Sequence, residues 1–206
     1  MNTTIVSLTE KVRKALDDIA PSVTDDFSSD LNAEIEQALL HAAMSLSETL
    51  PVPMLNVTVV TINTVKEADG SKGYAILPDD YMRLVSVRMN SWKGGVPELI
   101  ERGSEAEKRQ RSKWSQGTNS KPKVMLDGEK KGWTEESIQV IRLWPCNDST
   151  IFLSFIPKAK IENGSLVCAL KDGWCEKNLI YLTCRIILEG KKEVTTAEAF
   201  AKLTEI

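Results

Sequence analysis

Residues 31–62 read LNAEIEQALLHAAMSLSETLPVPMLNVTVVTI, and the spacing of the apolar side chains changes halfway along this segment. In the first half, apolar residues recur every three or four positions, which is the period of one helix face. Pro51 and Pro53 then end the helix, because proline has no amide hydrogen and clashes with the preceding turn. In the second half, β-branched residues alternate with polar ones, which is typical of a strand. The segment predicts a change from helical to β structure at residue 54.

Further helices are expected on both sides of this segment. Ser7-Leu-Thr-Glu10 is a capping-box pattern, and it predicts a helix over residues 8–19. Residues 174–189 carry a wide apolar band, which indicates a helix buried on most sides. A short last helix is predicted at 195–204. The region between the helices contains many short strands, and its last part, residues 158–173, looks irregular.

This order of elements predicts an α+β fold. We expect a helical bundle formed by the N- and C-terminal helices, with an inserted antiparallel β-sheet or sandwich. The expected division is a helical domain of residues 1–53 and 174–206 and an inserted β-rich domain of residues 54–173. An insertion of that length is within the usual size of an independent domain.

Charge is unevenly distributed along the 206 residues, whose net charge is −3. Residues 1–50 carry three basic and nine acidic side chains, whereas residues 83–131 carry twelve basic and six acidic ones. The overall acidic balance argues against a protein that grips nucleic acid nonspecifically. Complementary patches of this kind steer association between subunits. The other interpretation is two solvated surfaces without a partner.

Residues that carry chemistry are scarce in the sequence. His41 is the single histidine, and the four cysteines (Cys146, Cys168, Cys175 and Cys184) form no Cys-x-x-Cys pair. The doublet Asp79-Asp80 follows a proline, where aspartates usually hydrogen-bond their own turn. There is no glycine-rich phosphate loop and no apolar run long enough for a membrane span. We therefore expect a protein that is not an enzyme, with no catalytic residue, no metal and no cofactor.

A basic stretch over residues 102–123 is the candidate interaction site. Its members are Arg102, Lys108, Arg109, Arg111, Lys113, Trp114, Lys121 and Lys123. Cationic side chains around an aromatic one suit a nucleic-acid backbone with a stacked base. They equally suit an acidic protein surface, such as the helical end of a neighbouring subunit. The third interpretation is a solvated helix without a partner.

Three segments together resemble a known family. They read LPDDYMRLVSV at residues 77–87, IRLWPCNDSTIFLSF at residues 141–155, and a helix with an acidic start at residues 172–188. In this order, after two N-terminal helices, they resemble the tail tubular protein A family of short-tailed phages, which are portal adaptors. The family hairpin usually has a second proline in its turn, where this chain has Cys146 or Asn147.

The resemblance implies a structural virion protein, assembled in the host cytoplasm. It would be a head–tail adaptor whose helical domain forms a ring, typically a dodecamer, between the portal protein and the tail or next ring protein. Double-stranded DNA would pass through the lumen during ejection without specific binding. No membrane partner is expected. Two alternatives remain: another ring-forming assembly factor (a head-completion or tail-terminator protein), or a nucleic-acid-binding module that uses the basic stretch.

Overall fold

The computed structural model describes residues 2–19, 31–68, 71–93, 97–112, 114–130, 137–171 and 174–190. The predicted helix at 195–204 lies outside these residues. The chain divides into two compact units, of which the first contains residues 1–57 and 156–206 and the second contains Thr58–Phe155. The predicted boundaries lay at 53/54 and 173/174. Residues 156–171, which the prediction grouped with the inserted strands, therefore belong with the helices.

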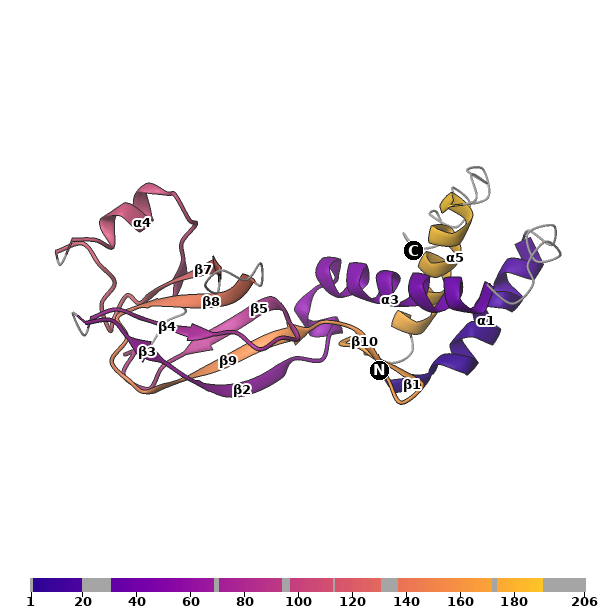
Figure 1. The fold of residues 1–206 in the computed structure, drawn as a ribbon, viewed down its shortest axis with the longest axis horizontal. Coiled ribbons are helices and arrows are strands. Elements are labelled where there is room, and N and C mark those ends of the chain that lie inside the picture. Colours follow the sequence, from indigo (N-terminus) through magenta and orange to yellow (C-terminus); the bar gives the residue numbers. More distant parts are fainter. Residues whose placement is uncertain are drawn as a thin grey trace. The chain divides into compact units, whose positions relative to one another are not determined.

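The first unit is built around three long helices in the described part of the chain: α1 (Ile5–Ile19), α3 (Leu31–Thr49) and α5 (Trp174–Gly190) (Figure 1). Helix α5 packs against both α1 and α3. The fully buried side chains recur at helical spacing, as Leu8 and Leu16 do on α1 and Ile35 and Leu39 do on α3. The three helices predicted from periodicity at residues 8–19, 31–50 and 174–189 are confirmed.

Helix α1 begins earlier than its capping-box pattern predicts. The helix starts at Ile5, so Ser7 lies inside its first turn instead of capping it. The reason is a tertiary contact, because the amide of Ile5 donates to the carbonyl of Gly164 at 2.9 Å. A distant loop thus satisfies one of the amides that the first turn of a helix leaves without a partner.

A small sheet belongs to the same unit. Its strand order is β1 (Asn2–Thr4), β11 (Ser165–Val167), β10 (Lys160–Glu162), and both pairings are antiparallel. The hairpin β10–β11 turns at Asn163 and Gly164, which have φ values of 50° and 71°. Asn-Gly favours this turn because both positions need the left-handed region. The prediction of irregular structure over 158–173 is therefore wrong in its central part.

The second unit contains two sheets. One has the order β2 (Thr58–Asn63), β9 (Thr150–Pro157), β5 (Tyr81–Arg88). The other has the order β3 (Val65–Lys66), β4 (Gly73–Ile76), β8 (Ser137–Trp144), β7 (Lys123–Lys130), β6 (Glu98–Leu99). Their shared core includes Phe155 and Leu153 from one sheet and Ile141 and Leu143 from the other. The two sheets therefore pack face to face.

The five-stranded sheet is also covered on its other face. Neighbouring strand residues point to opposite faces, so Val124 and Leu143 enter the shared core while Met125 and Trp144 form a second, smaller cluster. Ala106, from the short helix α4 (Glu105–Arg109), packs on that smaller cluster. This contact fixes α4 on the sheet.

The predicted fold class needs correction. An α+β fold agrees with the structure, but a helical bundle with one inserted antiparallel sheet or sandwich does not. The helical unit has a sheet of its own, because the N-terminal strand β1 pairs with β11 across more than 160 residues of sequence. The inserted region forms two sheets, and its pair β6–β7 is parallel. Strands outnumber helices among the described residues.

Candidate interaction surface around helix α4

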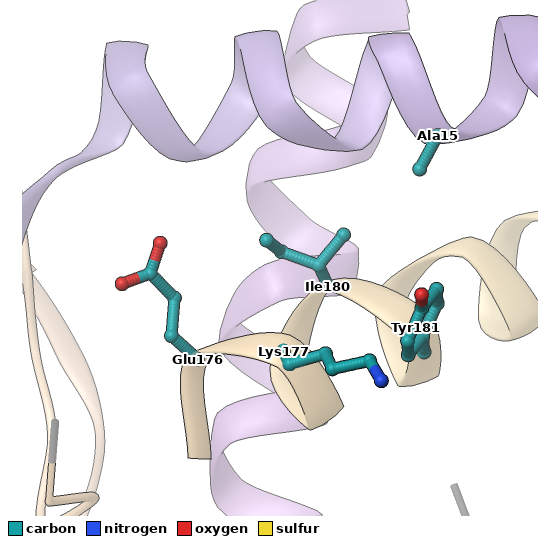
Figure 2. Close-up of a pocket in the computed structure, with 5 residues that line it drawn as sticks. All are labelled: Ala15, Glu176, Lys177, Ile180 and Tyr181. Atoms are coloured by element: carbon teal, nitrogen blue, oxygen red, sulfur yellow. The ribbon is translucent and has the colours of Figure 1, made fainter. Parts of the chain in front are cut away.

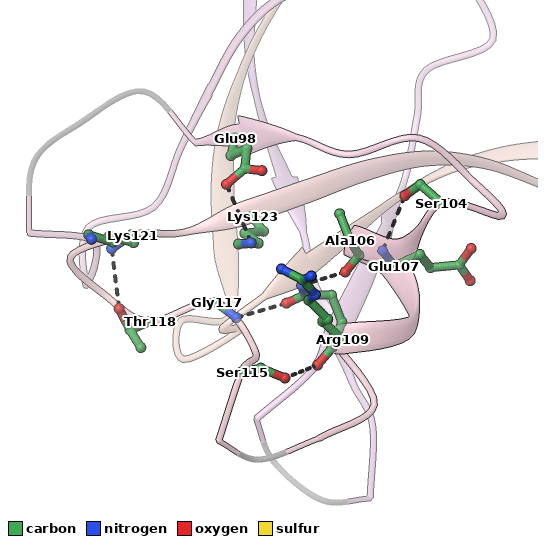
Figure 3. Close-up of polar contacts among 11 residues, drawn as sticks. Glu98, Ser104, Ala106, Glu107, Arg109, Ser115, Gly117, Thr118, Lys121 and Lys123 are labelled. Atoms are coloured by element: carbon green, nitrogen blue, oxygen red, sulfur yellow. Dashed lines mark hydrogen bonds and ion pairs between the residues drawn. The ribbon is translucent and has the colours of Figure 1, made fainter.

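Local sequence fixes the start of α4. Ser104 is its N-cap, and the Ser104 hydroxyl accepts a hydrogen bond from the amide of Glu107 at 3.2 Å. The Glu107 carboxylate in turn accepts from the amide of Gly103 at 2.5 Å. These reciprocal bonds resemble a capping box, except that the Glu107 carboxylate binds the amide of Gly103 and not that of the N-cap residue Ser104. Figure 3 shows the Ser104–Glu107 bond. The Ser-x-x-Glu pattern of Ser104 and Glu107 predicts a helix from Ser104 to Trp114; its start is confirmed, but the helix ends at Arg109.

The loop after α4 closes on the side chain of Gln110, which is 1% exposed. Its amide nitrogen donates to the carbonyl of Ala106 at 2.7 Å, and its amide oxygen accepts from the amide of Gly117 at 2.8 Å. The Ser115 hydroxyl donates to the carbonyl of Arg109 at 2.6 Å (Figure 3). A buried amide with both ends satisfied holds the two ends of the loop together.

The far end of this loop is held against strand β8. A Cβ built on Gly117 would overlap the carbonyl oxygen of Trp144 and lie 3.0 Å from its carbonyl carbon. Only glycine allows so close an approach of two backbones. Beyond it, Thr118 and Lys121 exchange two backbone hydrogen bonds, at 3.1 and 3.0 Å. The loop therefore projects from a fixed base.

Three of the eight residues of the basic stretch are paired with carboxylates. Arg102 lies 2.8 Å from Asp127, Lys108 lies 2.8 Å from Glu105, and Lys123 lies 3.4 Å from Glu98. The pair of Lys108 is solvent-exposed and stabilises little. What these pairs change is the charge that a partner meets, because each carboxylate neutralises one cation.

The remaining members form what we call the α4 surface: Arg109, Arg111, Trp114 and Lys121. The three cationic side chains are exposed, and within the described residues none has an ionic partner. Trp114 is 97% exposed, more than any other large apolar side chain in the described parts of the chain. Lys113 lies outside the described residues. The structure thus separates the predicted site into neutralised and free cations.

A charged hollow of about 350 Å³ lies beside α4 within the same unit. One lining group is the nearly buried carboxylate of Asp127, which accepts from Arg142 at 3.0 Å, while Arg142 also reaches Glu67 at 3.3 Å. The hollow is lined by four basic side chains (Lys72, Arg102, Arg111, Arg142) and three acidic ones (Glu67, Glu107, Asp127). Charges that nearly cancel give no strong preference for an anion.

Sequence reasoning missed Asp127, Arg142 and Gln110. Arg142 did leave a signal, since it interrupts the apolar run of residues 141–143 and a charge in a buried strand needs a partner. Its partner Asp127 lies on the neighbouring strand, fifteen residues away. Gln110 left no signal, because a glutamine beside a charged helix is ordinarily exposed.

Two hollows belong to the helical unit. The α3–α5 groove, of about 410 Å³, is lined by Glu34, Gln37, Ala38, His41, Ile186, Ile187 and Gly190. The other, of about 310 Å³, lies between α1 and α5 (Figure 2). There the Lys177 ammonium sits 5.5 Å from the centre of the Tyr181 ring, and Lys11 pairs with Glu176. The second hollow is thus bordered by charges of both signs.

The titratable groups with shifted pKa values lie in the cores. Burial raises the pKa of the Tyr81 phenol and of the Cys146 thiol, and it raises the pKa of Cys184 to about 12. Such thiols stay protonated and unreactive at neutral pH. In the described ranges, no three or more His, Cys, Asp or Glu side chains are grouped to hold a metal ion. None of the helices described there has both the length and the hydropathy to cross a bilayer.

Comparison with known proteins identifies no family. No protein-family model matches the sequence, and no curated protein matches it significantly. Functional inference therefore rests on the residues and on their geometry.

Proposed function

We propose that the chain is a structural subunit of a tailed-phage virion, a head–tail adaptor that joins the portal protein to the tail. In this proposal copies of the chain form a ring, typically a dodecamer, and double-stranded DNA passes through the lumen without specific binding. The mild net charge of −3 suits such a wall, since each phosphate that a protein neutralises adds affinity.

One observation carries the proposal. Two of the three segments on which the resemblance rests, residues 77–87 and 141–155, supply the neighbouring strands β5 and β9 of one sheet. The third segment supplies α5, which packs on both other long helices of its unit. Segments that resemble a family in sequence order thus each contribute buried core residues to the two units, which supports a shared architecture.

The α4 surface supports an assembly role as well. A tryptophan exposed almost completely, close in sequence to two arginines that have no ionic partner among the described residues, has the composition that dominates binding energy in protein interfaces. The same composition keeps a second candidate function open, a nucleic-acid-binding module in which Trp114 stacks on a base.

The test is native mass spectrometry of the full chain, alone and mixed with the cognate portal protein. We expect a closed ring, and a portal complex at physiological salt. Monomers under both conditions would sink the proposal, whereas a hexamer would favour a head-completion or tail-terminator protein. Duplex DNA binding that weakens steeply with salt, and that Arg109→Glu with Arg111→Glu removes, would favour the nucleic-acid-binding module.

A further inference from the structure

We infer that the outer edge of strand β2 pairs with the same edge of a second copy, antiparallel and with Thr61 of one copy opposite Thr61 of the other. We call this surface, the side of Thr58–Asn63 that faces away from β9, the β2 edge. The contact goes beyond the proposed function. It joins two copies around a two-fold axis, whereas a ring needs a contact between two different patches.

Strand β2 lies at the end of its sheet. The strand order is β2-β9-β5, and within the described parts of the chain β2 pairs with β9 alone. Figure 1 shows β2 along the lower border of the second unit, with β9 next to it. An edge strand presents a row of amides and carbonyls without partners, and another extended chain can add to that row.

The ladder with β9 shows which backbone groups point outward. The amide of Thr64 donates to the carbonyl of Ser149 at 2.9 Å, so these two residues form a hydrogen-bonded pair. Such pairs alternate with non-bonded pairs along an antiparallel ladder. The residues that direct their amides and carbonyls away from β9 are therefore Val59, Thr61 and Asn63. No described residue supplies a hydrogen bond to these outward groups.

The β2 edge lacks the features that keep sheet edges apart. Edges are usually protected by lysine, by proline, by a bulge or by a covering segment. Residues 54–65 contain no charged residue, no proline and no glycine, and the register with β9 runs through the strand without a bulge. Val59 is 66% exposed here, and Phe152 of β9 is exposed opposite Thr61 on the same face. The edge is thus suited to the addition of a strand.

The sequence of the strand selects a second copy as the occupant. Residues 57–65 read VTVVTINTV, which is nearly the same in both directions from Thr61. In an antiparallel pairing centred on Thr61, valine meets valine, threonine meets threonine and Val60 meets Ile62. Pairs of β-branched residues and of threonines stabilise neighbouring strands, and a strand without charges meets no like charge in its own copy.

The same register matches the outward backbone groups. With Thr61 opposite Thr61, Val59 of each copy lies opposite Asn63 of the other. All three outward residues then lie in hydrogen-bonded pairs, which together form about six hydrogen bonds. A shift by one residue would place outward groups against groups already bonded to β9. The phase comes from the ladder with β9 and the symmetry comes from the side chains, so two independent observations agree on one register.

Apolar side chains at the edge gain cover from this pairing. Val60 and Ile62 are half-buried and pack against the core between the two sheets of the second unit. In the proposed register, Val60 of one copy lies beside Ile62 of the other. The inner face of one sheet would therefore continue into the inner face of its partner.

Disulfides formed at chosen positions of the full chain test the register. Thr61→Cys places two thiols at the two-fold axis, where the Cα atoms of a hydrogen-bonded pair lie about 5.5 Å apart, within the roughly 4.4–6.8 Å that a disulfide spans. The four native cysteines are buried. We expect disulfide-linked dimers of Thr61→Cys under mild oxidation. Val59→Cys and Asn63→Cys are matched controls, which should link when mixed but not alone. No link from Thr61→Cys, or equal yields from all three variants alone, would overturn the inference.

Charge at the two-fold axis gives the energetic test. Thr61→Lys places like charges directly opposite each other, which should weaken dimerisation about tenfold or more in sedimentation. Thr61→Glu should act in the same way, and a mixture of the two variants should restore dimers because opposite charges then meet. The control is Ser86→Lys, at an exposed residue of β5 at the other end of the strand order, which should change dimerisation less than about twofold.

Dimers that tolerate Thr61→Lys, or a mixture of Thr61→Lys and Thr61→Glu that stays monomeric, would contradict the contact. Circular dichroism checks that each variant is folded. The folded state should tolerate these changes, because Thr61 is exposed.

Hydrogen exchange shows whether the edge is open in a single copy. The amides of Val59, Thr61 and Asn63 should exchange fast in dilute protein and become protected as the concentration rises. The alternate amides of the strand, which bond to β9, should stay protected at both concentrations. Protection of the three outward amides in dilute protein would mean that another segment of the same chain, such as residues 191–206, covers the edge. That result would overturn the inference.

The outcomes separate this inference from the proposed function. A ring that binds the portal protein, while Thr61→Cys gives no link, refutes the edge contact and leaves the adaptor proposal standing. Dimers linked through position 61, in a protein that forms no ring and binds no portal, support the edge contact and refute the adaptor. Links from position 61 to the portal protein in place of a second copy would assign the edge to that partner and refute self-pairing.

Discussion

Replacement of Gly117 by alanine should destabilise the second unit, and the size of the effect follows from two contacts. The new methyl group would overlap the carbonyl oxygen of Trp144 and lie 3.1 Å from the amide nitrogen of Lys123. Both neighbours are backbone atoms of paired strands, so neither moves without breaking ladder hydrogen bonds. The chain must shift at Gly117 instead, and that shift breaks the bond to the buried amide oxygen of Gln110.

The magnitude is the sum of these two effects. Overpacking costs about 1–3 kcal/mol, and the loss of a buried hydrogen bond costs about 1 kcal/mol, so the free energy of unfolding should fall by roughly 2–4 kcal/mol. Gly128→Ala is the matched control. Gly128 lies on strand β7 of the same sheet, and a Cβ built there meets nothing within 4 Å. Its effect should stay within about 0.5 kcal/mol.

Urea unfolding, monitored by hydrogen exchange of the peptides from β7 and β8, reports on the second unit specifically. With a slope of about 1–3 kcal/mol per molar urea, Gly117→Ala should lower the midpoint by roughly 0.7–4 M. Equal midpoints for the two variants, or a Gly117→Ala midpoint unchanged from the parent protein, would show that the loop yields freely. The reasoning that the loop is held rigidly on β8 would then be wrong.

Three further predictions concern the cores and the charge network. Leu39→Ala removes a fully buried side chain of α3 and should lower the free energy of unfolding in urea by about 2–5 kcal/mol. The control is Val6→Ala, which should cost about 0.5 kcal/mol or less because Val6 is 65% exposed. Equal costs would mean that α3 is not packed as described. Asp127→Asn should cost about 1–3 kcal/mol, because it removes the nearly buried negative charge that pairs with both Arg102 and Arg142, whereas Glu105→Ala at an exposed pair should cost under about 0.5 kcal/mol; the reverse order would contradict this. The pKa of Cys184 is about 12 in the folded chain and near 9 when unfolded, so the contribution of this thiol to the free energy of unfolding is complete below pH 9 and falls as pH rises toward 12. Between these two pH values, the free energy of unfolding should fall less steeply with pH in Cys184→Ala, by about 1.4 kcal/mol per pH unit. Identical slopes in the two proteins would refute the pKa shift.

Periodicity predicted the long helices and the main strands, because each of these elements buries a repeating face. The spacing of Ile35, Leu39 and Ala42 identifies α3 as a helix without any knowledge of the elements that it packs against. The Ser-x-x-Glu pattern at residue 104 correctly predicted a helix start, because the capping hydrogen bonds form within one turn of the chain. At residue 7 the same pattern misled, because the carbonyl of Gly164, remote in sequence, lets α1 begin two residues before Ser7.

The candidate site was predicted only as a stretch of sequence. The basic residues and Trp114 were identified from composition, but the sequence alone does not tell Arg102 from Arg111. Strand pairing brings Asp127 to Arg102, and the fold of the loop leaves Arg111 without an ionic partner among the described residues. Neutralisation depends on residues that are distant in the chain, so only the tertiary structure decides which cations a partner meets.

The sequence by itself determined the change from helix to strand after Pro51, the positions of α3 and α5, and the separation of acidic and basic segments. Each of these is a local pattern with a fixed period or a simple count. The tertiary structure alone decided that β1 pairs with β11, that residues 156–171 belong with the helices, and that the inserted strands form two sheets. Partner choice between strands depends on burial of a shared face, and no short window of sequence contains both sides of that contact.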